Sequence, residues 1–164
     1  MAYQIILYLH VASALGFFLF HGATASATFG LKREKSQASI EVLLRMRELG
    51  SAGAFLALLI MLISGIVLGF MGRFWSDIWI WASIAIFLVI GTVMGASGRN
   101  YFDRVSYAID PEKYKAPKDK KDDPEPPTEE DLTVELAKGR PVMLTVTGIA
   151  SLVLFLWLMM FKPF

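Results

Sequence analysis

Two histidines, His10 and His21, lie in the apolar stretch LHVASALGFFLFHGAT, and they are the only histidines of the 164-residue chain. Eleven residues of α-helix make about three full turns, so both imidazoles project from the same side, about 16 Å apart along the axis. Neutral imidazole is the usual axial ligand of haem. The pair therefore predicts two candidate axial ligands for haem b or another tetrapyrrole.

The type of ligation stays open, because a bis-histidine haem needs a second ring from another helix and the chain has no third histidine. The second ligand of the haem iron could be a methionine such as Met61 or Met94, or a histidine of a second copy. A five-coordinate haem or chlorophyll-type pigment would need no second ligand. The competing interpretation is structural, with each imidazole donating a hydrogen bond to a neighbouring helix. Either way the rings must meet something other than acyl chains, since unsatisfied polar groups are costly in a bilayer.

No other pattern in the sequence indicates catalysis. No nucleophile–base pair, carboxylate pair or metal-binding cluster is recognisable, so we predict no catalytic and no metal-ligating residue. The absence of cysteine excludes disulfides, thiolate metal sites and covalent c-type haem attachment. A transporter is disfavoured because no charged residue lies near the middle of an apolar stretch.

The elements that carry these residues are membrane spans. The chain is 55% hydrophobic, with a mean hydropathy of +0.51, and its apolar residues form long runs. Four runs are long enough to cross a bilayer as helices, at about 5–29, 52–71, 78–97 and 142–161. We predict an all-α, four-transmembrane-helix bundle forming a single membrane domain over 1–164. A cleaved signal peptide is the alternative for the first run, but no Lys or Arg precedes it.

The basic residues indicate the orientation of the bundle. The connection at about 30–51 holds five Lys or Arg and the one at about 98–141 holds nine, whereas the short connection between them has only Arg73. Lys and Arg collect on the cytoplasmic side of membrane proteins. We therefore predict an N-out, C-out protein of the bacterial cytoplasmic membrane with two cytoplasmic loops.

The two predicted cytoplasmic loops differ in kind. Residues 36–50 place Ile40, Leu43 and Leu44 at helical spacing, which predicts an amphipathic segment on or near the inner surface. The second loop is charged and rich in proline until Thr128, after which a short helix is expected to end before Gly139.

Small residues indicate where the helices approach one another. Gly65 with Gly69, and Gly91 with Gly95, form two small-xxx-small pairs, at opposite depths because their helices run in opposite directions. On the first helix Ala12, Gly16, Ala23 and Ala27 share one stripe. We expect the first helix to pack against the second and third, although contacts with another subunit would explain the glycines equally well.

The stretches LYLHVASALG, LISGIVLGF and LMMFKPF, with the basic segment after the first span, resemble small four-helix bacterial membrane proteins of uncharacterised function. They are also distantly similar to the copper-resistance D and HemJ-like groups. HemJ-like proteins are haem-containing protoporphyrinogen oxidases that use a histidine of the first helix, which corresponds to His10. They carry a lysine in the third span, and this chain has none there.

Together these patterns favour a non-catalytic subunit or scaffold that packs into a larger membrane complex, one that carries electrons or pigments. The alternative is a small haem b-binding oxidoreductase with His10 as axial ligand. The expected partners are the lipid bilayer and other membrane subunits or a second copy, and nothing indicates nucleic acid.

Overall fold

The computed structural model describes residues 1–112, 114 and 128–163. Within them the chain is helical and forms no strand. Its elements are α1 (Ala2–Leu31), α2 (Gln37–Gly72), the 3-10 turn η1 (Phe74–Ser76), α3 (Ile78–Ile109), α4 (Glu129–Ala137) and α5 (Pro141–Phe161).

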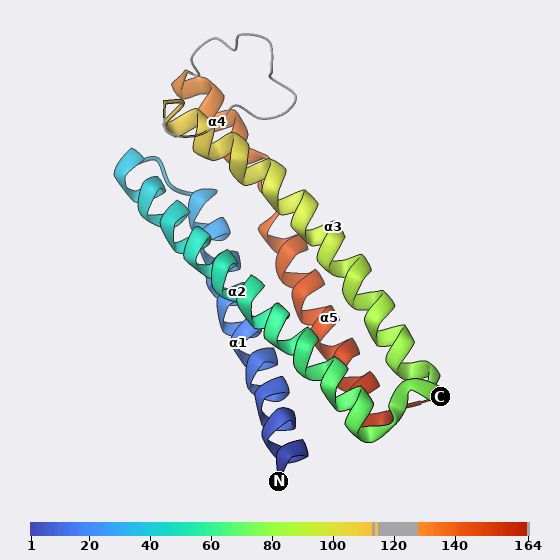
Figure 1. The fold of residues 1–164 in the computed structure, drawn as a ribbon. Coiled ribbons are helices and arrows are strands. Elements are labelled where there is room, and N and C mark those ends of the chain that lie inside the picture. Colours follow the sequence, from blue (N-terminus) through green and yellow to red (C-terminus); the bar gives the residue numbers. More distant parts are fainter. Residues whose placement is uncertain (113, 115–127, 164) are drawn as a thin grey trace.

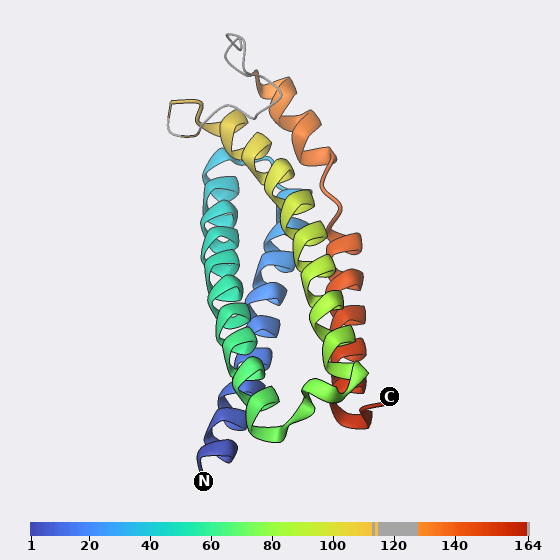
Figure 2. The same cartoon turned by 45° about the vertical axis from the view of Figure 1, so that its right-hand side comes forward.

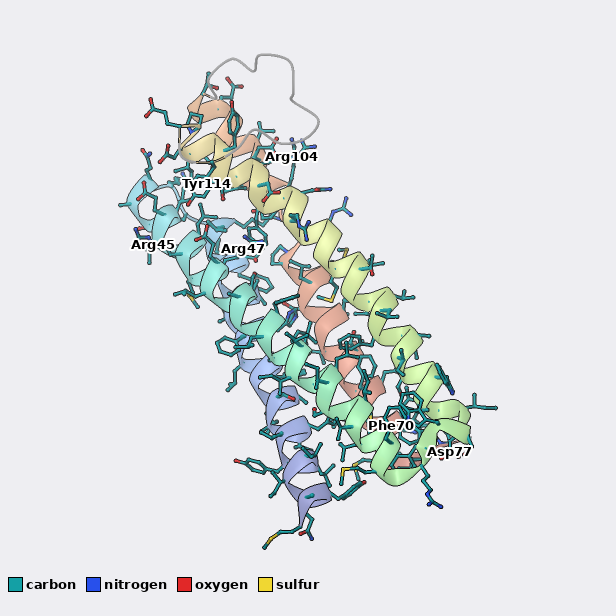
Figure 3. All side chains as sticks on the ribbon, in the orientation of Figure 1. Arg45, Arg47, Phe70, Asp77, Arg104 and Tyr114 are labelled. Carbon is teal, nitrogen blue, oxygen red and sulfur yellow. The ribbon has the colours of Figure 1, made fainter. Side chains whose placement is uncertain are left out.

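Four helical stretches in this part of the chain are long and apolar enough to cross a membrane, namely α1, α2, α3 and the stretch that ends with α5. They lie as an antiparallel bundle, with both termini and the α2–α3 link at one end (Figure 1). The opposite end carries the α1–α2 connection and α4, and we call it the basic end. Arg45, Arg47 and Arg104 lie at this end, far from Phe70 and Asp77 (Figure 3).

The predicted spans all fall inside these helices, but α2 and α3 are longer than predicted. The α2 helix begins at Gln37 rather than near 52, and α3 continues to Ile109 rather than ending near 97. At the basic end the first turns of α2 lie beside the last turns of α1, and the last turns of α3 lie beside α4 (Figure 2). Both helices continue through a glycine, Gly50 in α2 and Gly98 in α3, because apolar residues of the extensions are buried against one another.

The best-buried core lies at the basic end, outside the predicted spans. Six residues are buried together there, and we call them the basic-end cluster: Leu31, Ile40, Leu44, Phe102, Val105 and Leu136. They come from α1, α2, α3 and α4. Above Phe102 the Arg47 guanidinium carbon lies 4.0 Å from the ring centroid, which adds a cation–π contact between α2 and α3.

The segment 36–50 is therefore helical, as its pattern indicates, but its apolar side is buried against protein. Ile40 and Leu44 belong to the basic-end cluster, and Leu43 packs against it. The short helix expected after Thr128 is α4, which places Leu136 in the same cluster. The charged, proline-rich part of the predicted second loop falls mostly outside the described residues.

The α1 helix packs along α2 and, less extensively, against α5. The expected packing of α1 against α2 is confirmed; α1 shares the basic-end cluster with α3, but its second main neighbour is α5. The α3 helix instead contacts α4 and α5, for example through the rings of Phe87 and Phe155, whose centroids are 6.4 Å apart. Between their two ends α2 and α3 diverge, as both ribbon views show (Figures 1 and 2).

Candidate functional site

His10 joins α1 to α2 through a backbone carbonyl. Its Nδ1 lies 2.9 Å from the carbonyl oxygen of Met61 and 3.1 Å from Oγ of Ser64. A carbonyl oxygen only accepts, so Nδ1 carries the proton and donates, and Nε2 of the neutral ring is the acceptor. The imidazole is thus fixed in one tautomer by its neighbour helix.

Two small residues of α2 make room for this ring. A side chain at Gly65 would begin 3.1 Å from Cε1 of His10, so glycine allows the imidazole to lie against the helix. Ser64 is buried and donates to the carbonyl oxygen of Ile60 over 2.7 Å, which leaves its oxygen lone pairs directed toward His10. This explains why one glycine of the Gly65–Gly69 pair occupies its position.

His21 meets a different helix, although it shares a side of α1 with His10. Its ring stacks on Phe17, with centroids 5.6 Å apart and planes 19° from parallel. On the other side it lies directly against Gly148 of α5, where any added side chain would overlap Nε2. Nε2 is consequently covered by α5, and this arrangement leaves no room for a planar ligand there.

The His21 contact leaves polar atoms without hydrogen bonds. Within the described residues, Nε2 of His21 and Oγ1 of Thr145 are both buried and unpaired. Thr145 precedes Gly148 by three residues, so both lie on the same face of α5, the face that meets His21. An unpaired buried polar group destabilises a protein by about 1–3 kcal/mol.

The hydroxyls on this side of α1 are satisfied by their own helix. Ser13 donates to the carbonyl of His10, Thr24 to that of Phe20, and Thr28 to that of Thr24. Ser13 and Thr28 are buried. The polar side of α1 therefore faces protein along much of its length, mainly α2.

The predicted small-residue stripe of α1 divides in the structure. Ala27 is buried and Gly16 faces Ala57 of α2, with 3.9 Å from its Cβ position to that of Ala57. Ala23 is half-buried, whereas Ala12 is exposed. The stripe thus contacts protein at Gly16 and Ala27 but not at Ala12.

Sequence reasoning missed the closest approach of α1 and α2. A side chain at Gly50 would begin 2.6 Å from Oγ1 of Thr24, and one at Gly53 would overlap the ring of Phe20. With Ala57, these residues repeat at intervals of three and four, which places them on one face of α2. That spacing is visible in the sequence but does not form a G-x-x-x-G pair.

The second small-residue pair has no neighbour within the described chain. At Gly91, Gly95 and also Gly98, an added Cβ would meet no atom within 4 Å. The three lie within about 60° of one another around α3 at 100° per residue. Gly69 of the first pair is different, because its Cβ position is 3.1 Å from Ile80 and 3.2 Å from Trp75.

Aromatic side chains fill the end of the bundle near η1. Trp75 packs on Trp81 with centroids 5.4 Å apart, and Phe74 on Trp79 at the same distance. The ammonium of Lys162 lies 4.2 Å from the Phe74 ring centroid. These rings contact one another at the kind of position, the end of an apolar helix, where Trp is enriched in membrane proteins.

The described residues contain no group of three or more His, Asp or Glu that could hold a metal ion.

Comparisons with protein-family models, curated proteins and solved structures gave no match. The fold and composition therefore define the class alone: an all-helical protein whose four apolar helices have the length and character of membrane spans.

Proposed function

We propose that this chain is a non-catalytic subunit of a larger complex in the bacterial cytoplasmic membrane, one that carries electrons or pigments. It joins the complex through the α3 surface around Gly91, Gly95 and Gly98, which we call the glycine surface. The basic end faces the cytoplasm and both termini face outward, in keeping with the distribution of Lys and Arg.

The observation that carries the proposal is the open space beside the three glycines. Glycine inside a helix destabilises by roughly 0.5–1 kcal/mol relative to alanine, so three on one side need a compensating contact. Within the described chain no such contact exists, whereas Gly50, Gly53, Gly65 and Gly148 each face another helix closely. A helix of another subunit would supply it, since small residues let membrane helices approach closely.

Co-purification in mild detergent tests the proposal. The wild-type protein is expected to retain a stoichiometric membrane partner, and the double substitution Gly91→Leu/Gly95→Leu is expected to lose it. Gly22→Leu is the matched control, because Gly22 also has nothing within 4 Å but lies on α1. Loss of the partner in the control, or retention in the double variant, would contradict the role of the glycine surface.

The second candidate function is a small haem b-binding oxidoreductase with His10 as axial ligand. Its support is the hydrogen bond from Nδ1 to the Met61 carbonyl, since haem- and metal-ligating histidines donate their other ring N–H in this way. Nε2 would then be the ligating atom, and a bound haem would supply electron transfer. His21 is disfavoured in this role by its contact with Gly148.

The visible spectrum separates the two functions. A Soret band that is present in the purified protein, lost in His10→Ala and kept in His21→Ala would favour the oxidoreductase. A preparation that keeps its partner and whose spectrum is unchanged by His10→Ala would favour the subunit role.

A further inference from the structure

A groove of about 640 Å³ lies at the basic end, between the last turn of α1 and the first turns of α5. Its charged and apolar lining residues include Lys32, Arg33, Arg140, Phe29, Val142 and Val146. All six are exposed, so the groove is open to its surroundings along the side of the bundle.

The three cations of the groove have no carboxylate partner in the described part of the chain. The ion pairs there join Glu135 to Arg104 and to Lys138, and none of these three residues lines the groove. The nearest acidic residue in sequence, Glu34, accepts hydrogen bonds from the backbone N–H groups of Lys35 and Ser36. The groove therefore keeps a net positive charge.

The polarity of the groove changes along the bundle axis. On α1, apolar Phe29 precedes Lys32 and Arg33 toward the basic end, and on α5 Arg140 precedes Val142 and Val146 away from that end. Both walls thus place cations beyond the span and apolar side chains beside it. A molecule matching this groove has an anionic head and an apolar tail lying along the span.

We infer that this groove binds one anionic phospholipid, with its phosphate among Lys32, Arg33 and Arg140 and an acyl chain along Phe29 and Val146. Basic pockets between membrane helices on the cytoplasmic side commonly bind such headgroups. A free phosphate or an acidic peptide would leave the apolar wall unused. The inference uses α1 and α5 only and stands independently of the glycine surface on α3.

Native mass spectrometry of the full chain in detergent provides the test, with palmitoyl-oleoyl phosphatidylglycerol as the probe. The wild type is expected to retain one phosphatidylglycerol and to discriminate against phosphatidylcholine with the same acyl chains. Each neutralised cation should weaken retention roughly fivefold, so Lys32→Gln/Arg33→Gln/Arg140→Gln should lose the lipid. Millimolar inorganic phosphate should not displace it.

The matched control is Lys35→Gln/Arg45→Gln/Arg99→Gln, which removes the same charge from exposed positions that do not line the groove. It is expected to retain the lipid. Val146→Trp provides a second variant that keeps all three cations. The indole ring would fill the groove, and the fold should tolerate it because Val146 is exposed. This variant too should lose the lipid.

Any of four results would overturn the inference. These are equal retention of phosphatidylcholine, undiminished retention in the groove triple variant or in Val146→Trp, loss of the lipid in the control triple variant, and displacement by inorganic phosphate alone. The last result would indicate a site for a free anion in place of a lipid.

Discussion

Nδ1 of His10 donates a hydrogen bond of 2.9 Å to the backbone carbonyl oxygen of Met61, and this bond ties α1 to α2 within the apolar part of both helices. A polar group of this kind survives in a bilayer because protein meets it. The neighbouring Gly65 allows the approach by lacking a side chain.

Replacing His10 by alanine should therefore weaken the α1–α2 contact. We expect a loss of about 0.6–2 kcal/mol in the free energy of unfolding, the range measured for hydrogen bonds between membrane helices. Unfolding in mixed micelles with increasing denaturing detergent measures it. The exposed Tyr8 gives a control, since Tyr8→Ala removes more atoms from a surface position. Equal stability of His10→Ala and the wild type would contradict the structural role of this bond.

The contact between His21 and Gly148 predicts a suppressor relationship. Gly148→Ala should destabilise the protein by about 1–3 kcal/mol, because the added methyl overlaps the imidazole. In a His21→Ala background the same substitution should be almost neutral. Thermal unfolding of the four proteins in detergent measures the coupling. Additive effects of the two substitutions would show that the residues do not touch.

The basic-end cluster should contribute more stability than any surface exposed toward lipid. Phe102 is buried in it, so Phe102→Ala should lower the free energy of unfolding by about 3–5 kcal/mol. Phe55→Ala, at a position on α2 that is 69% exposed, removes the same atoms and should have a small effect. Similar losses in both variants would mean that the cluster is not the principal core.

Glu34 predicts a dependence of stability on pH. The backbone N–H groups of Ser36 and Lys35 hold the pKa of the Glu34 carboxyl below its usual value of 4.5. The ionised carboxylate thus favours the folded state, so its contribution is present above about pH 4.5 and lost as the pH falls through the lowered pKa. Glu34→Gln should show a smaller loss of stability than the wild type between pH 6 and pH 3. An identical loss in both proteins would contradict this assignment.

The long apolar runs were sufficient to predict the four stretches of the described chain that are helical and long and apolar enough to cross a membrane. Their ends were less predictable, because α2 continues to Gln37 through Ile40 and Leu44, whose packing depends on Phe102 in a distant part of the chain. Hydropathy identifies the segments that can enter a membrane. It does not identify which helices pack against one another beyond those segments.

The same limit applies to the candidate site. Helical geometry places His10 and His21 on one side of α1, yet they meet α2 and α5 respectively. Small residues indicate a close approach but not which helix approaches, so the close α1–α2 contact at Gly50 and Gly53 was missed. The order of helices around the bundle decides such pairings, and no local pattern encodes it.

The most direct test of the proposed subunit role is cross-linking from the glycine surface in native membranes. The chain has no cysteine, so Gly95→Cys and Gly22→Cys each introduce a single thiol, which a benzophenone maleimide converts into a photo-cross-linker. The proposed role predicts one protein adduct of defined mass from position 95 and none from position 22. Adducts with lipid alone at both positions, in a preparation otherwise intact, would contradict it.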